Sequence, residues 1–113
     1  MVTARTLCVT IDRPSSEVYE FVRDPANLPK WAAGIDPGAR VRFVERNALG
    51  VLDHYVATPH GEVHVPMRVI AHGERSEFVF TLLRGPGMTE AMFDEDAGAV
   101  ERDLAALKRV LEV

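Results

Sequence analysis

The sequence predicts an α+β domain in which a curved antiparallel sheet wraps around one long C-terminal helix. Three observations lead to this fold class. The first segment and the middle of the chain alternate apolar and polar residues with a period of two, as half-buried strands do. Connections that contain glycine or proline separate the middle strands, as in an antiparallel meander. The final segment instead repeats apolar residues every three to four positions, as a single amphipathic helix does.

Composition narrows the class of protein before any motif is considered. The chain has 113 residues and a formal net charge of −4, which predicts one domain spanning residues 1–113. An acidic chain is a poor partner for nucleic acid or an anionic membrane, because both attract basic surfaces. Cys8 is the only cysteine, so no disulfide forms within the chain. Without a signal-peptide pattern or an apolar run of about 20 residues, we expect a cytoplasmic protein with no membrane insertion.

The amino-terminal part is expected to form a strand followed by two short helices. RTLCVTID alternates apolar and polar residues, which indicates a half-buried strand. Pro14 suits the first turn of the next helix, which has one apolar stripe. Asp24-Pro25 ends that helix, because a residue before proline avoids helical backbone angles. A second short helix, ANLPKWAAG, carries Trp31, the only tryptophan.

Four strands and a long helix are expected in the rest of the chain. The strands are RVRFVERN, GVLDHYVAT, EVHVPMRVIA and SEFVFTLL. A four-residue loop at HGER pairs Val69 with Phe78. Thr89 is a suitable N-cap for the helix, whose apolar stripe consists of Phe93, Ala97, Val100, Leu104, Leu107 and Leu111. A sheet with one apolar face needs a cover, and this stripe supplies it.

Several segments resemble a known superfamily. VTIDRPSSEVYEFVRDPANLPKWAAGI resembles the opening of the START-like (SRPBCC) superfamily, and more narrowly its polyketide cyclase/dehydratase and lipid-transfer branch. GVLDHYV, VPMRV, EFVFTL and VERDLAALKRVLE are similar to an uncharacterised bacterial subgroup. The resemblance runs nearly end to end and implies a helix-grip fold. It implies little about any reaction, because this fold hosts binders, carriers and enzymes.

One departure from the superfamily pattern concerns the sheet. A strand or hairpin usually follows the tryptophan-containing helix, but here Ile35 reaches Arg40 through only four residues. Either the sheet is reduced, or residues of the natural chain are absent from this sequence. A missing hairpin would open one side of a pocket or leave a sheet edge for a partner. Homodimer formation through a sheet edge is therefore an expected partner interaction.

The faces of the central strands depend on the length of one loop. If Pro59-His60-Gly61 forms a three-residue loop, Asp53 and Tyr55 lie on the apolar face of the sheet. A loop of two or four residues reverses this arrangement, so that His54 lies inside and Asp53 outside. We favour the three-residue loop, because proline followed by a left-handed glycine suits it.

The histidines of VLDHYVATPHGEVHVPMR raise the question of a metal site. His54 and His64 lie on paired strands whose geometry does not converge on His60, which occupies the turn. No cysteine or glutamate completes a known ligand spacing. We therefore expect solvated histidines near a turn, and neither a metal nor another cofactor.

Asp53 and Tyr55 are the candidate catalytic residues. A carboxylate on an apolar face has a raised pKa and is a functional-site candidate. Asp53 would act as general acid or base with Tyr55 as a hydrogen-bond donor, and His54 would take part if the register is reversed. In the plainer interpretation, Asp53 binds backbone amides or an arginine, such as Arg40 or Arg42, and stabilises the fold.

The resemblance implies binding of a small apolar or amphipathic molecule between the sheet and the C-terminal helix. The expected ligand-binding residues are Trp31, Phe43, Asp53, Tyr55, Met67, Phe80 and Met92. Trp31 has a plainer interpretation as an anchor for its short helix. A cyclase or dehydratase acting on a polyketide-like substrate is one alternative function, and a non-catalytic dimerising module is another. Whether the protein is an enzyme stays open at this point.

Overall fold

The computed structural model describes residues 2–33 and 38–113, which form antiparallel strands and helices in the expected order, except that the single strand expected over EVHVPMRVIA is divided into two at Pro66. The elements are β1 (Ala4–Ile11), α1 (Ser15–Arg23), η1 (Pro25–Asn27), α2 (Leu28–Trp31), β2 (Val41–Phe43), β3 (His54–Thr58), β4 (Gly61–Val65), β5 (Met67–His72), β6 (Arg75–Leu83) and α3 (Glu90–Leu111). Residues 34–37 of the short connection noted above lie outside the described residues. Within the described ranges, no strand lies between α2 and β2, so the sheet is reduced.

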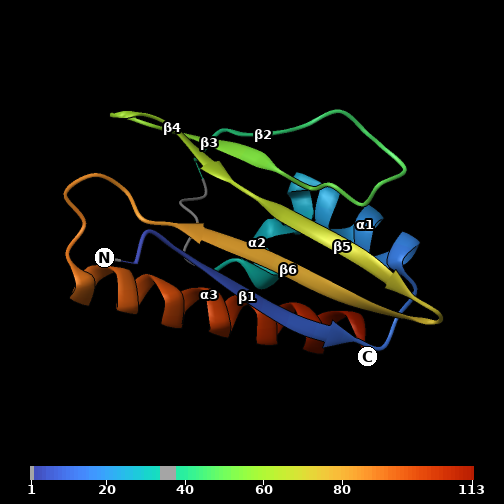
Figure 1. The fold of residues 1–113 in the computed structure, drawn as a ribbon. Helices are drawn as coiled ribbons and strands as arrows, with labels where there is room; N and C mark the ends of the chain where they lie inside the picture. Colours follow the sequence, from blue (N-terminus) through green and yellow to red (C-terminus); the bar gives the residue numbers. More distant parts are fainter. Residues whose placement is uncertain (1, 34–37) are drawn as a thin grey trace.

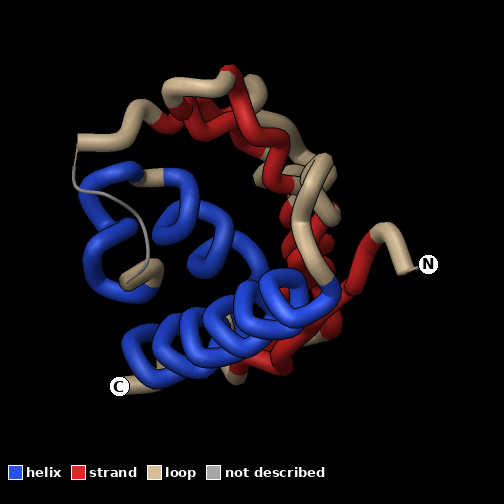
Figure 2. Tube along the Cα trace, turned by 90° about the vertical axis from the view of Figure 1, so that its left-hand side faces the viewer, coloured by secondary structure: helices blue, strands red, loops and turns tan. Residues whose placement is uncertain are grey.

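The strands form two three-stranded antiparallel sheets that share one continuous run of chain. Their orders are β1-β6-β5 and β2-β3-β4, and Pro66 joins β4 directly to β5. The chain before β3 continues along β5, because Leu52 N–H donates to the Met67 carbonyl at 2.9 Å. The result is one curved surface that wraps around the helices on its concave side (Figures 1 and 2).

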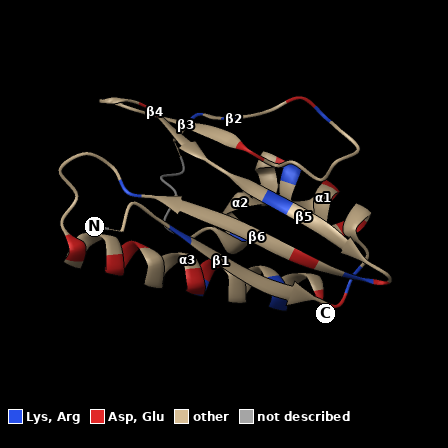
Figure 3. Cartoon of the chain, viewed as in Figure 1, with Lys and Arg blue, Asp and Glu red and all other residues tan. Residues whose placement is uncertain are grey.

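Helix α3 covers the concave side as its sequence pattern predicts. It begins at Thr89, whose hydroxyl accepts a hydrogen bond from Met92 N–H at 3.1 Å. Every residue of the predicted apolar stripe is buried. The acidic residues of the helix occupy positions between the residues of this stripe (Figure 3). Within residues 2–33 and 38–113, no helix is both long enough and apolar enough to cross a membrane.

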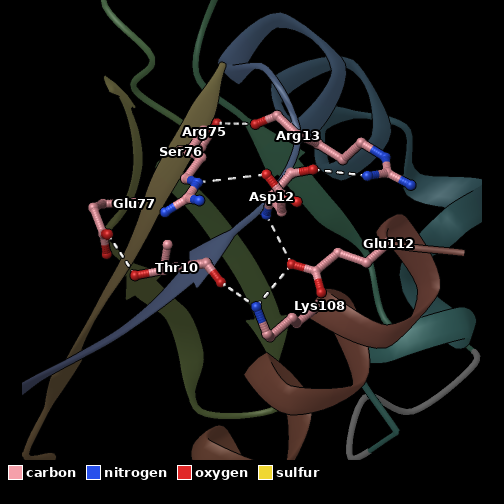
Figure 4. Close-up of polar contacts among 8 residues, drawn as sticks. All are labelled: Thr10, Asp12, Arg13, Arg75, Ser76, Glu77, Lys108 and Glu112. Atoms are coloured by element: carbon pink, nitrogen blue, oxygen red, sulfur yellow. Dashed lines mark hydrogen bonds and ion pairs between the residues drawn. The ribbon is translucent and has the colours of Figure 1, made fainter. Parts of the chain in front are cut away.

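A polar network fixes the C-terminal turns of α3 to the sheet. Lys108 Nζ donates to the Thr10 carbonyl at 2.7 Å, and the Asp12 N–H donates to Glu112 Oε2 at 2.8 Å (Figure 4). Fully buried Ser76 donates to the Arg13 carbonyl at 2.7 Å. We call this part of the molecule the closed end; its residues are Thr10, Asp12, Arg13, Arg75, Ser76, Glu77, Lys108 and Glu112.

The register predicted for the β3–β4 hairpin is wrong by one residue. The turn consists of Pro59 and His60 alone, with Thr58 opposite Gly61. Thr58 closes this tighter turn itself, because its hydroxyl donates to the Gly61 carbonyl at 2.6 Å and accepts from His60 N–H at 3.2 Å. The alternative of a two-residue loop therefore holds, and His54 lies on the concave face.

The register predicted for the β5–β6 turn is confirmed. Val69 lies opposite Phe78, and both residues are buried on the concave side. The two hairpins differ in what determines their pairing. The β5–β6 pair carries apolar side chains that would be exposed by a shift of one residue, whereas the β3–β4 tip is exposed on both strands.

Candidate functional site

The concave face of β2, β3 and β4 carries an apolar surface with one histidine. In the observed register, Phe43 lies opposite His54, which lies opposite Val65. His54 is 3% exposed, and its ring centroid is 4.9 Å from that of Phe43. Among the described residues, the imidazole makes one hydrogen bond, a long contact of 3.4 Å between Nδ1 and the Leu52 carbonyl.

Burial determines the charge state of His54. Desolvation lowers the pKa of the imidazole below its ordinary value, and the nearby Leu52 carbonyl and Asp53 carboxylate only partly oppose this effect. The imidazole is therefore neutral near pH 7, with one nitrogen as donor and the other as acceptor. A neutral buried imidazole with spare hydrogen-bonding capacity can hold or transfer a proton at a bound molecule.

Trp31 is a second buried polar group on the concave side. Its side chain packs edge-on against Phe78 with ring centroids 6.1 Å apart, so it anchors α2 to the sheet as the plainer interpretation expected. Its indole Nε1–H is buried and finds no acceptor within the described part of the chain. A buried donor without a partner is unusual in folded proteins and calls for an explanation.

Apolar residues near the tip of the hairpin are left partly exposed. Val41, Val56 and Val63 follow each other across β2, β3 and β4 on the concave face, and Val63 is 50% exposed. The tip stands well away from α3 in both views (Figures 1 and 2). We call β2 and the β3–β4 hairpin the open end of the molecule.

The structure corrects the predicted positions of Asp53 and Tyr55, which lie on the convex side of the sheet. Asp53 Oδ1 accepts the Met67 N–H at 3.0 Å, and Oδ2 lies 3.1 Å from His64 Nε2. Tyr55 stacks on the His64 ring at 4.9 Å, and the Arg42 guanidinium lies over the Tyr55 ring. Asp53 thus replaces a missing backbone acceptor beside Pro66, which agrees with the plainer interpretation of this residue.

The other predicted ligand-binding residues are divided between the interior and the surface. Met67 is buried and Phe43 and Phe80 are half-buried on the concave side, whereas Met92 is 51% exposed on α3. Over residues 2–33 and 38–113, no three histidine, cysteine or acidic side chains gather in a metal-binding arrangement.

A cavity of about 650 Å³ lies outside this interior, between α1, the loop before β3 and the edge of β5. Its lining includes Tyr19, Leu49, Arg68 and Ile70. Sequence reasoning treated the loop only as a connection and missed the cavity. The spacing of Asn47 and Gly50 was the available signal, because both residue types favour ordered, non-helical loop conformations.

Comparison with known proteins identifies the fold but no sequence family. No family model and no curated protein matches the sequence. The structure is similar to that of DynU16, a protein of the dynemicin biosynthetic locus, with a TM-score of 0.77 and 16% identity. It is also similar to the Aha1 dimer from Colwellia psychrerythraea, with a TM-score of 0.74 and 16% identity. A third similar structure is the di-domain ARO/CYC BexL from the BE-7585A biosynthetic pathway, with a TM-score of 0.64 and 20% identity.

These similarities cover different shares of the other proteins. All or nearly all of this chain is aligned in each case, with 98% of the Aha1 protein but only 48% of DynU16 and 47% of BexL. Together with the topology, they show a helix-grip fold with a reduced sheet, which is the fold that the sequence resemblance implied. At these identities the comparison establishes the fold alone.

Proposed function

We propose that this domain binds a small hydrophobic or amphipathic molecule between its sheet and its helices. The observation that carries the proposal is the unsatisfied indole Nε1–H of Trp31 in the apolar interior. Ligand sites in proteins are mostly apolar and contain a few polar groups that orient the ligand. A ligand acceptor atom at Trp31 would explain the missing hydrogen bond.

The chemistry of the interior suggests which molecules fit. Trp31 Nε1 only donates, whereas the neutral His54 ring donates or accepts. A complementary ligand has carbonyl or hydroxyl oxygens on a flat or aliphatic apolar skeleton. Met67, Phe43 and Phe80 would contact that skeleton, and the partly exposed valines of the open end would border its entrance.

A cyclase-like reaction is the second candidate function. His54 lies on the concave face, and burial lowers its pKa so that it is neutral near pH 7. A neutral imidazole in an apolar site is a suitable general base for removing a proton beside a carbonyl group. Two structural neighbours, DynU16 and BexL, come from biosynthetic loci or pathways, which supports a polycyclic or polyketide-like ligand. Asp53 lies on the convex side and is replaced by His54 in this candidate mechanism.

The only tryptophan provides a selective test by NMR. Titration of the ¹⁵N-labelled protein with emodin, a polyhydroxylated aromatic ketone, should shift the single indole N–H resonance of Trp31. His54→Phe should weaken binding about tenfold, the effect expected for one lost hydrogen bond to a buried partner. His60→Phe, on the exposed turn, is the matched control and should leave the affinity unchanged.

Two results would contradict these proposals. If emodin shifts resonances only on the convex face and leaves the Trp31 indole unchanged, the interior is not the binding site. For the cyclase-like candidate, a poly-β-ketone model substrate should be cyclised by the wild type and not by His54→Gln. Equal turnover by the two proteins would exclude His54 as the base.

A further inference from the structure

We propose that the cavity beside β5 is a second binding site, which takes a small amphipathic anion such as a medium-chain carboxylate. We call it the edge groove; it lies between α1, the loop Arg46–Gly50 and β5. Its volume of about 650 Å³ is within the range of small-molecule sites. This site is separate from the interior around Trp31 and His54, so it goes beyond the function proposed above.

Asn47 gives the loop wall of the edge groove a defined shape. Its side-chain Oδ1 accepts hydrogen bonds from the N–H groups of Leu49 and Val51 at 3.0 and 3.1 Å. Its Nδ2 donates to the Glu45 and Val51 carbonyls, each at 3.0 Å. One side chain therefore satisfies four backbone groups of a loop that has no regular secondary structure of its own.

The loop is also attached to the elements on both sides of the groove. The Asn47 N–H donates to the Tyr19 hydroxyl of α1 at 3.0 Å. On the other side, the Gly50 carbonyl accepts the Val69 N–H of β5 at 2.9 Å. Gly50 has a φ of 76°, and a Cβ atom there would lie 2.1 Å from the Val69 carbonyl oxygen. Only glycine permits this close approach, so the walls of the groove are held in place.

The anchored walls of the groove leave two apolar side chains exposed to solvent. Leu49 is 73% exposed and Ile70 is 46% exposed. A hydrocarbon chain in the groove would remove apolar surface of both residues from water, which favours binding.

The charges at the groove favour an anion. The Arg46 guanidinium is paired with Glu20, whose second oxygen lies 3.1 Å from Nη2. The Arg68 guanidinium has no hydrogen bond or ion pair with any residue in the ranges 2–33 and 38–113. The groove therefore has one uncompensated positive charge, although the whole chain has a net charge of −4. A carboxylate forms a bidentate pair with such a guanidinium.

Calorimetric titration with decanoate and with 1-decanol separates the charge from the hydrocarbon. We expect decanoate to bind at least tenfold more tightly than the alcohol. Arg68→Gln should weaken decanoate binding about tenfold and leave 1-decanol binding unchanged. Arg109→Gln, which removes an exposed charge of the same type from α3, should change neither affinity. Ala71→Phe, which adds bulk to a lining residue, should abolish both.

Three results would overturn the proposal. The first is equal decanoate affinity in the wild type and Arg68→Gln. The second is decanoate binding that survives Ala71→Phe but is lost in His54→Phe, which would place the ligand in the interior. The third is a wild-type dimer that Ala71→Phe converts to a monomer in sedimentation, because the groove would then be an interface between copies. A negative emodin titration would not affect this test, because emodin binding is measured at Trp31 in the interior and decanoate binding is tested at the edge groove.

Discussion

The closed end and the open end of the sheet are built from the same kind of antiparallel strands but are stabilised differently. At the closed end, Ser76 and Lys108 connect β6 and α3 to the carbonyls of neighbouring elements, over a fully covered core. At the open end, the concave face ends in partly exposed valines, and its polar contacts lie on the convex side, where Arg42 pairs with Glu62. Folding stability is therefore expected to reside mainly at the closed end.

The difference also separates stability from binding. Apolar surface that is already buried in the free protein stabilises the folded state. Apolar surface that is still exposed contributes favourable free energy only when a ligand covers it. His54 lies at the boundary between the buried and the partly exposed apolar surface, since it is itself buried but lies beside the partly exposed side chains of Phe43 and Val65.

Truncation of one side chain at each end should give the largest contrast. Leu107 is fully buried on α3, and Leu107→Ala should lower the free energy of unfolding by about 2–5 kcal/mol. Val63→Ala, at a site that is 50% exposed, should change it by less than about 0.5 kcal/mol. Urea denaturation measures both values. Similar losses for the two variants would show that the hairpin is as important to folding as the closed end.

Two glycines with left-handed backbone angles give the next contrast. Gly50→Ala introduces a Cβ atom that clashes with the Val69 carbonyl, whereas nothing lies within 4 Å of a Cβ atom at Gly73 in the β5–β6 turn. We expect a loss of about 3 kcal/mol for Gly50→Ala and about 1 kcal/mol for Gly73→Ala. Thermal denaturation checks the order. Equal losses would mean that the loop does not need its close contact with β5.

The pH dependence of stability should show the smallest effect. The pKa of His54 is lowered by burial in the folded state, so the unfolded chain binds more protons as the pH falls below about 6.5. The stabilising contribution is therefore present above that pH and decreases toward pH 5.5. The difference in unfolding free energy between pH 7.5 and 5.5 should shrink in His54→Phe but not in His60→Phe. An unchanged difference in His54→Phe would show that another group dominates.

Most of the fold could be predicted because its determinants are periodic. The stripe of α3 from Phe93 to Leu111 and the pairing of Val69 with Phe78 both follow from burial on one face. The β3–β4 register could not be obtained in this way. Both possible loops place apolar residues on the concave face, and the hydroxyl of Thr58 selects the shorter one.

The candidate sites were less predictable than the fold. Trp31 was recognised as either a ligand contact or an anchor, but its unpaired Nε1–H depends on the acceptors around it, which no local pattern gives. The edge groove was missed because its shape comes from four hydrogen bonds of Asn47. The loop is also held by two long-range contacts, from Asn47 N–H to the Tyr19 hydroxyl and from Val69 N–H to the Gly50 carbonyl, which have no periodic signature in sequence.

Pro66 has a consequence for how the molecule opens. It has no N–H group, and the adjacent Met67 N–H is bonded to the Asp53 side chain instead of to a neighbouring strand. The β-ladder is thus interrupted where β4 becomes β5. We therefore expect the hairpin and the β1-β6-β5 sheet to open as separate cooperative units in local unfolding. Hydrogen exchange in the hairpin should then proceed by sub-global opening, while the amides that pair β1 with β6 remain protected until the whole domain unfolds.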